Sequence, residues 1–465
     1  MESESFADTE VPFWRKRRYH VVLMVFFGLV NLLTLRVTLS VAIVQMIQKT
    51  NVTLEDGTVV EEQEFDWDST TVGYILSSYF YGYITTQILG GLLASRFGPH
   101  LVFGIGIGSN AVLVLLIPVA TKANVAFLIT IRVLQGVIGG VTYPSILGIW
   151  SQWAPVYERA FMGNVAYTGN YVGLIAAMAL SGLMTVAWGW ESVFYVFGVV
   201  GCIWYIAWVF VVRANAESDP FIKEAEKKYI ISSIGERSKH KNIKHPWKDI
   251  LLSPAVWAVS VANFVSMFGT FMLLTELPLF LNDTMDFELN TTGILAAIPY
   301  IVGIVFLFIA GYSADWVQVK GYLRTGQVRR YWNCVSCLVE MVFMILTTVA
   351  TTPALTITYI SLAVGASTFS FAGYLANALD LAPTHASVIH GITNSFGTLA
   401  GILAPMITGY IVTDKKVEQY HIVFYITAGI YLFGAVFYWF FCRGNLQPWA
   451  KIDLAEKEAK KTTVQ

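Results

Sequence analysis

The chain has 465 residues, of which 55% are hydrophobic and only 13% are charged, and its mean hydropathy is +0.59. Because ordinary soluble domains carry about 25% charged residues, this composition excludes a water-soluble protein of such length and indicates a membrane protein. A net charge of −1 offers no basic surplus for nucleic acid, and four cysteines are too few for a disulfide scaffold.

Twelve apolar stretches of membrane-spanning length follow one another along the chain. A membrane helix needs about 20 mostly apolar residues, and the stretch 69–94 contains no Asp, Glu, Lys or Arg. The first stretch follows Arg15–Arg18 and is too long for a signal peptide. We therefore predict an all-α integral membrane protein. Its spans are expected at 20–47, 69–94, 101–121, 123–150, 160–187, 191–212, 254–281, 291–314, 329–350, 354–378, 386–412 and 421–442.

Basic residues are distributed unevenly between the two sides of these spans. If the N-terminus is cytoplasmic, 24 of the 30 Lys and Arg fall in inner segments and four fall in outer loops. Cytoplasmic loops of multi-pass proteins carry such an excess. Both terminal segments, 1–19 and 444–465, are therefore predicted to be cytoplasmic. The membrane itself is either the plasma membrane or a lysosomal or vesicular membrane.

The first outer loop, at about 48–68, is acidic and contains the sequon that begins at Asn51. Two further sequons, which begin at Asn282 and Asn290, also fall on the outer side. Such a sequon is an acceptor for N-glycosylation when it faces outward. These asparagines are the predicted glycosylation sites of a glycoprotein.

A long polar stretch, 214–250, divides six spans from six. The two halves also resemble each other, because Gly91–Ser95 ends the second span much as Gly311–Asp315 ends the eighth. We expect an N-terminal six-helix bundle at 20–213, a cytoplasmic linker, and a C-terminal six-helix bundle at 251–443. Paired halves of this kind are typical of rocking transporters, whose substrate site lies between the halves.

Two arginines lie inside spans of the N-terminal half. Arg36 is well inside span 1, with no carboxylate in that span, and Arg132 is in span 4 on the same helix face as Gln135 and Gly139. An arginine at a helix centre costs roughly 2.5–3.5 kcal/mol, and its guanidinium matches carboxylate or phosphate. Both arginines are candidate ligands of an anion. The alternatives are a structural ion pair for Arg36 and snorkelling to the interface for Arg132.

Three titratable residues of the C-terminal half are candidates for binding a coupling ion. Glu276, just before Pro278, is either a hydrated interfacial carboxylate or a coupling group, and Glu340 lies near the middle of span 9. His390 in span 11 could titrate near neutral pH, although a packed neutral histidine is the commoner case. Sodium or a proton is the ion these groups would bind, and no other cofactor is indicated.

No nucleophile elbow, phosphate-binding loop or metal cluster is found in the sequence, so the patterns do not favour an enzyme. Cys334 and Cys337 form a CxxC pair inside a span, where packing is expected rather than redox or metal chemistry. Tyr79 and Tyr83 lie one turn apart in span 2, and packing is the ordinary role of such a pair.

Several segments resemble the anion–cation symporters of the major facilitator superfamily, also called solute carrier family 17. That group includes sialin, the vesicular glutamate transporters and the type I sodium–phosphate cotransporters. The similarity extends over roughly residues 20–442. It rests on Arg36 with Leu39–Val44, Ile75–Gln87 with Gly90 and Gly91, Gly140–Pro144, Trp153–Pro155 with Glu158 and Arg159, Leu273–Pro278, Leu379–Pro383, and Gly391 and Ile392 with Asn394 and Pro405.

The resemblance implies a major facilitator fold of twelve helices in two bundles, with a substrate path lined by spans 1, 4, 7 and 10. It also implies that Arg36 and Arg132 are the membrane arginines of the family. Tyr79 and Asn394 lie in the matching motifs and are taken as further candidate substrate ligands.

The chain departs from the family pattern at positions tied to coupling and specificity. Relatives usually have an acidic residue where this chain has Gly139, and sialin-like members have another where it has Gln135. The span-2 histidine of the vesicular glutamate transporters is Leu76 here. Anion binding is therefore expected, while the residues that the family ties to proton coupling and to glutamate specificity are absent at these positions.

Together these features predict a secondary active transporter of a small organic or inorganic anion, such as a carboxylate or phosphate. We expect a monomer that works by alternating access, coupled to sodium, a proton or the membrane potential. Its partners are the anion and the lipid bilayer, and no nucleic acid. The alternatives are an uncoupled facilitator and a non-transporting membrane receptor or sensor that retains the fold.

Overall fold

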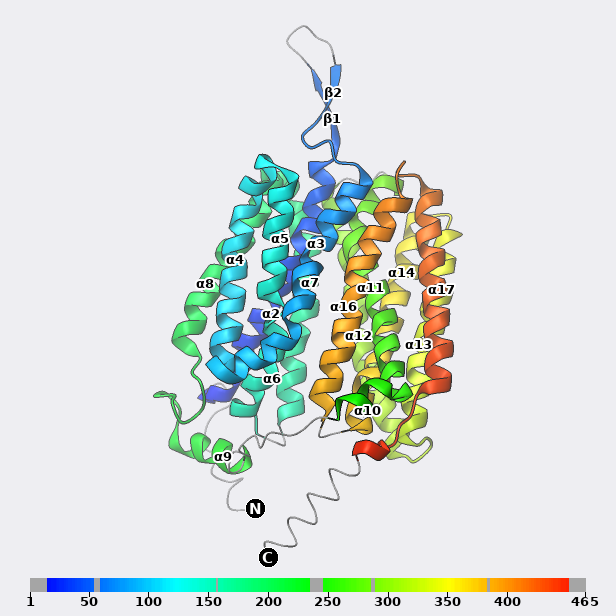
Figure 1. Ribbon diagram of the computed structural model, residues 1–465. Coiled ribbons are helices and arrows are strands. Elements are labelled where there is room, and N and C mark those ends of the chain that lie inside the picture. The colour runs from blue at the N-terminus through cyan, green and yellow to red at the C-terminus, as the bar shows by residue number, and fades with distance from the viewer. Residues whose placement is uncertain are drawn as a thin grey trace, which may run out of the picture. The chain divides into compact units, whose positions relative to one another are not determined.

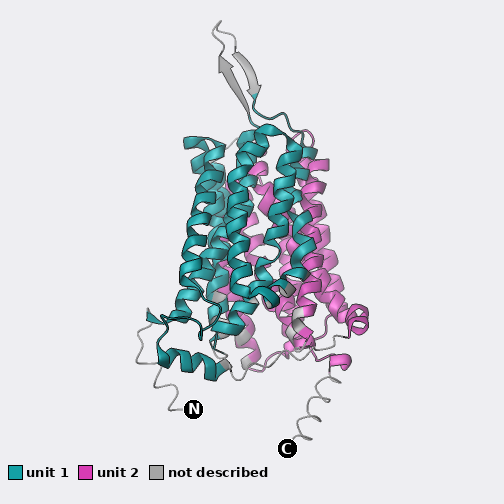
Figure 2. Cartoon of the chain, turned by 60° about the vertical axis from the view of Figure 1, so that its left-hand side comes forward, with its two compact units in different colours: residues 1–243, 287–297 teal, residues 244–286, 298–465 magenta. Residues whose placement is uncertain are grey.

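The computed structural model describes residues 15–53, 59–155, 158–234, 246–285, 289–382 and 385–450. The chain divides into two compact units, each of which is considered by itself (Figure 2). Unit 1 comprises residues 1–243 and 287–297, and unit 2 comprises residues 244–286 and 298–465. The start of helix α12 (Leu289–Val319) thus groups with unit 1, and the rest of that helix with unit 2.

Unit 1 is a bundle of long apolar helices with a small hairpin at one end and a short polar helix, α9, at the opposite end (Figure 1). The hairpin pairs two antiparallel strands, with Asn51 opposite Glu61. The elements are α2 (Arg17–Met46), β1 (Lys49–Thr53), β2 (Val59–Gln63), α3 (Ser69–Phe97), α4 (Pro99–Ala123), α5 (Val125–Gly139), α6 (Thr142–Trp153), α7 (Arg159–Trp188), α8 (Trp190–Val211) and α9 (Glu224–Ile234).

The ends of these helices follow ordinary capping chemistry. Helix α3 begins after Asp68, whose carboxylate accepts a hydrogen bond from the backbone N–H of Thr71 at 2.9 Å. Hydrogen bonds from Thr71 hold the pKa of Asp68 below its ordinary value. The Asn124 side chain caps α5 in the same way, by accepting from the N–H of Phe127 at 2.8 Å. Such caps satisfy backbone donors that a helix leaves unpaired at its start.

In unit 1, α2 packs mainly on α7, α3 on α5, and α4 on α8 and α5. The α3–α5 contact brings the two backbones together at reciprocal glycines. A Cβ at Gly82 would overlap the carbonyl oxygen of Val133, and a Cβ at Gly136 would overlap the carbonyl oxygen of Tyr79. Small residues allow such close approach inside a membrane. This approach places Tyr79 directly against α5.

Unit 2 is a second helical bundle. One of its helical segments contains a π-helical turn at Phe371–Leu375, and π-turns inside helices are frequent at functional sites. The remaining elements are α10 (Trp247–Leu252), α11 (Pro254–Met285), α12, α13 (Thr325–Thr348), α14 (Pro353–Ser367), η2 (Phe371–Leu375), α15 (Ala376–Leu381), α16 (Ala386–Ile411) and α17 (Val417–Phe441).

The helix packing of unit 2 repeats that of unit 1. Helix α11 packs on α16 and α13 on α17, as α2 packs on α7 and α4 on α8. Because these pairs hold corresponding places in the two sets of six predicted spans, the internal repeat seen in the short Gly91–Ser95 and Gly311–Asp315 segments extends to the packing.

The helices coincide with the predicted spans to within a few residues at most ends. Ten segments in the described part of the chain are long and apolar enough to cross a membrane. Two predicted spans are interrupted: span 4 divides into α5 and α6 at Gly140 and Val141, and span 10 contains η2. The β1–β2 hairpin, between the first two spans, and helices α9 and α10, between the sixth and seventh, were not predicted.

Helix α9 is held by buried charges against the end of unit 1 that lies opposite the hairpin. Arg18 lies 3.0 Å from Glu158 and 3.5 Å from Glu226, and the side chains of Arg18 and Glu226 are almost completely buried. Arg17 pairs with Asp219 at 2.8 Å, and Tyr229 donates a hydrogen bond to Glu158 at 3.1 Å. The first part of the linker is therefore an integral element of unit 1.

Candidate functional site

Two guanidinium groups share one tyrosine ring inside unit 1. The guanidinium carbon of Arg36, on α2, lies 4.9 Å from the centroid of the Tyr79 ring, and that of Arg132, on α5, lies 5.3 Å from it. Tyr79 itself belongs to α3 and is 1% exposed. Three predicted site residues from three helices thus meet in one cluster, which we call the two-arginine cluster.

Arg36 is half-buried and surrounded by aromatic rings. Its guanidinium carbon also lies 4.5 Å from the ring centroid of Phe80 and 5.4 Å from that of Tyr83. The rings of Tyr79 and Tyr83 are stacked at 5.7 Å. Because the face of an aromatic ring attracts a cation, these rings hold the guanidinium in place without adding a negative charge.

Arg132 is 3% exposed, so it does not snorkel to the membrane interface. Its Nη1 donates to Oε1 of Gln135 at 3.1 Å, and its Nη2 donates to the carbonyl oxygen of Arg36 at 3.3 Å. The expected shared face of Arg132 and Gln135 is confirmed. These hydrogen bonds fix the position of the Arg132 guanidinium. Both acceptors are neutral, so they do not compensate its positive charge.

Buried donors without acceptors gather in this cluster. Among the described residues, Nε of Arg132 and Nε2 of Gln135 have no hydrogen-bond partner, and neither has the acceptor Oδ1 of Asn110. Asn110, on α4, donates from Nδ2 to the carbonyl oxygen of Gln135 at 3.2 Å. Buried polar groups are nearly always paired. The unpaired N–H donors of Arg132 and Gln135, next to two guanidinium groups, therefore favour an anionic ligand.

Because Gly139 has no side chain, the Tyr79 hydroxyl can lie against the α5 backbone at that position. A Cβ at position 139 would overlap the hydroxyl oxygen and lie 3.1 Å from Cζ of the same ring. Sequence reasoning noted Gly139 on the helix face of Arg132 and as a position where relatives have an acidic residue, but it did not predict the contact with Tyr79. Asn110, a lone amide in an apolar helix, was also missed, although its polarity in such a segment is a signal.

Asn394 and His390 belong to unit 2 and lie on α16. The Asn394 side chain is half-buried, and the His390 side chain is exposed. Nearby, Nδ2 of Asn263 on α11 donates to the carbonyl oxygen of Thr393 at 2.8 Å, which ties α16 to α11.

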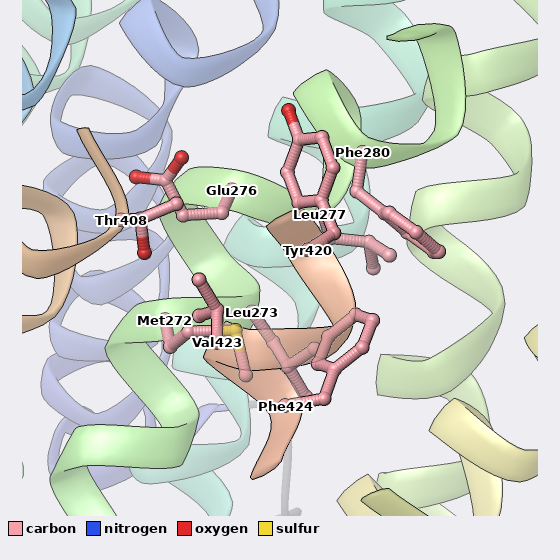
Figure 3. A pocket seen from close by; sticks show the side chains of 9 residues that line it. All are labelled: Met272, Leu273, Glu276, Leu277, Phe280, Thr408, Tyr420, Val423 and Phe424. Atoms are coloured by element: carbon pink, nitrogen blue, oxygen red, sulfur yellow. The ribbon is translucent and has the colours of Figure 1, made fainter. Parts of the chain in front are cut away.

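Glu276 lies in a small pocket between α11, α16 and α17 (Figure 3). It is 6% exposed, so its prediction as a hydrated interfacial carboxylate is wrong. The Thr275 hydroxyl donates to Glu276 at 3.2 Å. Tyr420, which also lines the pocket, donates to Asp283 at 2.7 Å. The pocket is otherwise lined by Met272, Leu273, Leu277, Phe280, Thr408, Val423 and Phe424.

Glu340 is 1% exposed on α13, and the structure supplies the partners that the sequence could not. The Ser336 hydroxyl donates to Glu340 at 3.3 Å, and the Tyr431 hydroxyl on α17 also hydrogen-bonds to it. A Cβ at Gly269 on α11 would overlap the Tyr431 hydroxyl. Glu340 is therefore held by neutral hydroxyl groups from two helices.

Metal-binding chemistry is not indicated in the described part of the chain, where no group of three or more His, Cys, Asp or Glu side chains converges. The four cysteines, which all lie within it, are free thiols. The charged groups that could bind an ion or a charged substrate are the guanidiniums of Arg36 and Arg132 in unit 1 and the buried carboxyl groups of Glu276 and Glu340 in unit 2.

Comparison with known families identifies the superfamily to which the chain belongs. The model of the Major Facilitator Superfamily matches residues 21–405. The chain belongs to this superfamily. Within the superfamily it is similar to vesicular glutamate transporter 1 of Xenopus tropicalis, at 38% identity over 94% of this chain and 76% of that protein. Human vesicular glutamate transporter 2 is 37% identical over 95% of this chain and 77% of that protein. The chain is thus a member of the anion–cation symporter family that these transporters represent.

Solved structures agree on the fold of this superfamily member. A bacterial homologue of the human lysosomal transporter Spinster, in an inward-facing and unoccupied conformation, gives a TM-score of 0.72 at 14% identity. That match covers 93% of this chain and 99% of the other. A D-xylose–proton symporter gives 0.64 at 14% identity, covering 92% and 98%. These likenesses show the fold, and the family match makes the chain a multi-pass membrane protein and a secondary transporter, whose relatives are transporters rather than enzymes.

Proposed function

We propose that this transporter binds its anionic cargo at the two-arginine cluster, with Arg36 and Arg132 as the charged ligands and Tyr79 between them. The observation that carries the proposal is the pair of guanidinium groups, 4.9 and 5.3 Å from one ring, in the membrane interior. Placing two such charges in a low-dielectric interior is costly, and a bound carboxylate or phosphate offsets that cost through parallel hydrogen bonds.

Asn394 is proposed as a further substrate ligand from unit 2. A half-buried amide on α16 can donate to an anion and accept from its hydroxyl or amino groups. The named relatives are glutamate transporters, and we extend to this chain the broader class of small carboxylates and phosphate. The departures at Leu76, Gln135 and Gly139 are the reason for not restricting the cargo to glutamate.

Arg36→Lys tests the site directly. Lysine keeps the positive charge but loses the planar fork and its five donors, so uptake of the best anion should fall at least tenfold while surface expression is retained. The measurement is counterflow of labelled anions in proteoliposomes containing purified protein. Near-normal counterflow by the variant would refute the assignment of Arg36, and absence of counterflow in the wild type for every anion tested would favour the receptor alternative.

For coupling we propose His390, Glu276 and Glu340 as the groups that bind and release an ion. Glu276 and Glu340 are buried carboxyl groups that accept hydrogen bonds from neutral hydroxyl groups, and a carboxylate in such surroundings is stabilised by a proton or a cation. His390 has an exposed imidazole. Sodium, a proton and the membrane potential remain the candidate driving forces.

We further propose that both termini are cytoplasmic, that the protein works as a monomer, and that the membrane is either the plasma membrane or a vesicular one. Asn51, on the β1 strand of the outer hairpin, is the best-placed glycosylation site. Asn282 lies in the last turn of α11 and Asn290 in the first turn of α12, so the helices extend into both sequons. A mass shift after glycosidase treatment that disappears in Asn51→Gln would support this placement.

A further inference from the structure

The space beside Gly139 in the two-arginine cluster is filled by a neutral hydroxyl group. Tyr79 reaches from α3 across the α3–α5 contact, and its hydroxyl lies where any side chain at position 139 would have to begin. A tyrosine hydroxyl has an ordinary pKa near 10, so at neutral pH it contributes no negative charge. Both neighbouring groups of Arg132 on the hydrogen-bonding side, Gln135 and the Arg36 carbonyl, are neutral as well.

The charge of unit 1 within the membrane is therefore positive. Across residues 20–212, acidic residues occur only in the outer loop and at Glu158 and Glu191. Glu158 pairs with Arg18 at 3.0 Å, and Glu191 pairs with Lys122 at 2.7 Å, both at the ends of helices. The membrane-embedded parts of these helices thus carry two positive charges, from Arg36 and Arg132, and no negative one.

From this we infer that the two-arginine cluster selects a doubly charged anion, such as a dicarboxylate, sulfate or hydrogen phosphate, over a singly charged one. This inference rests on the proposed function and adds the charge of the cargo. A dianion neutralises both guanidiniums, whereas a monoanion leaves one positive charge in a region of low dielectric, where charges interact strongly. The idle donors on Arg132 and Gln135 add hydrogen bonds to the same ligand.

Equilibrium binding measures this preference without any assumption about coupling. A ligand that binds the folded protein raises its melting temperature in proportion to the logarithm of its concentration over its Kd. We expect succinate and sulfate to stabilise the purified full-length protein at concentrations at least tenfold lower than butyrate and nitrate. The succinate–butyrate pair tests carboxylates, and the sulfate–nitrate pair tests inorganic oxyanions.

A pair of matched variants tests the origin of the preference. Tyr79→Phe removes the hydroxyl and opens space at position 139, and Gly139→Glu or Gly139→Gln is then added in that background. The two double variants have side chains of nearly equal size and differ by one negative charge. We expect the ratio of dianion affinity to monoanion affinity to be at least tenfold lower in the Glu variant than in the Gln variant.

The outcomes separate the inference from the proposed function. Wild-type protein that binds monoanions and dianions equally well, or Glu and Gln variants with the same preference, would overturn the inference and leave anion transport standing. Wild-type protein that binds no anion at all would overturn the proposed function together with the inference. The wild-type comparison stands even if neither double variant folds.

Discussion

At the residue scale, the chemistry of the site comes from two arginines, the half-buried Arg36 and the buried Arg132, whose guanidiniums share the Tyr79 ring. Arg36 and Arg132 could be found from the sequence alone, because a charged residue in an apolar span is costly and therefore has a role. The role of Gly139 could not be found that way. A glycine in an apolar helix has many uses, and only the structure shows that the Tyr79 hydroxyl lies against it.

Arg36 and Arg132 should act on the same anion, which a double-mutant cycle measures. Since both guanidiniums contact Tyr79 and Arg132 donates to the Arg36 backbone, loss of either should disable the same binding event. Arg36→Gln and Arg132→Gln should each weaken anion affinity at least tenfold, and the double variant should lose much less than the product of the two. Residues in contact typically couple by about 0.5–3 kcal/mol.

Strictly multiplicative losses in that cycle would assign the two arginines separate roles and make Arg132 a structural charge. Lys122→Gln serves as the control, because Lys122 is exposed and its partner is Glu191 at the end of α8. Exposed ion pairs contribute about 0–1 kcal/mol, so this variant should bind the anion as the wild type does.

At the element scale, the helices were predictable because apolar length alone defines a membrane span. The interruptions within spans were not. The break between α5 and α6 at Gly140, and the π-turn η2 at Gly373, both contain a glycine that lies closely on a neighbouring helix, and sequence periodicity does not encode such contacts. Gly373 in η2, for example, lies directly on Asn333 of α13, where a Cβ would come within 2.7 Å of the Asn333 Cβ.

Gly136→Ala should separate α3 from α5 and reduce the yield of folded protein. The added Cβ would overlap the Tyr79 carbonyl oxygen, which is backbone and cannot rotate away. Overpacking of a well-packed core typically costs about 1–3 kcal/mol, so we expect a clear drop in melting temperature in detergent. Gly429→Ala is the matched control in α17, because nothing lies within 4 Å of the position that its Cβ would take.

If Gly136→Ala melts at the same temperature as Gly429→Ala, the close α3–α5 contact does not contribute to stability. If it folds but loses anion binding, the contact positions Tyr79 instead. Helix propensity favours alanine over glycine by about 1 kcal/mol, so a destabilised Gly136→Ala variant cannot be explained by the helix itself.

At the scale of the whole molecule, sequence predicted the division into six spans, a linker and six spans, but it described the linker merely as polar. The structure shows that the first part of the linker is anchored in unit 1. Arg18 and Glu226 are separated by 208 residues in the chain and meet at 3.5 Å. A contact between residues so far apart in the chain depends on the folded topology, so the Arg18–Glu226 ion pair could not be predicted from the distribution of charges along the sequence.

Glu226→Ala should release helix α9 from unit 1. It removes an acceptor for the backbone N–H groups of Arg17 and Arg18, at 2.9 and 3.1 Å, and leaves the buried Arg18 side chain with Glu158 as its remaining acidic partner. Breaking a buried ion pair by removing one partner typically costs about 3–5 kcal/mol. Limited trypsin digestion should then cut at Lys227 or Lys228 much faster than in the wild type.

Glu224→Ala is the control for that experiment, because Glu224 lies in the same helix and is exposed. Unchanged digestion of Glu226→Ala would show that α9 is held by other contacts, such as the hydrogen bond from Tyr229 to Glu158. Faster digestion of both variants alike would point to a general loss of helix stability.

Coupling involves the whole molecule, because the proposed cargo site lies in unit 1 and the proposed ion-binding groups lie in unit 2. The predicted spans within residues 20–212 contain neutral residues at positions 135 and 139 and no carboxyl group except Glu191 at a span end, so this half offers no carboxyl group deep in the membrane to exchange a proton with the site. The membrane potential alone can drive an anion, with about 2.3 kcal/mol per charge per 100 mV. We therefore expect anion uptake to depend weakly on a pH gradient and clearly on potential or on sodium.

The decisive measurement is anion uptake into proteoliposomes with the potential clamped at zero and sodium absent. Under these conditions an imposed pH gradient should give little concentrative uptake, whereas restoring a potential or a sodium gradient should give several-fold accumulation. Strong uptake driven by the pH gradient alone would contradict this expectation and require a proton route through unit 2. In that case Glu276→Gln, Glu340→Gln and His390→Ala identify the route, because the variant that abolishes the pH-driven component while leaving counterflow intact marks the proton-binding group.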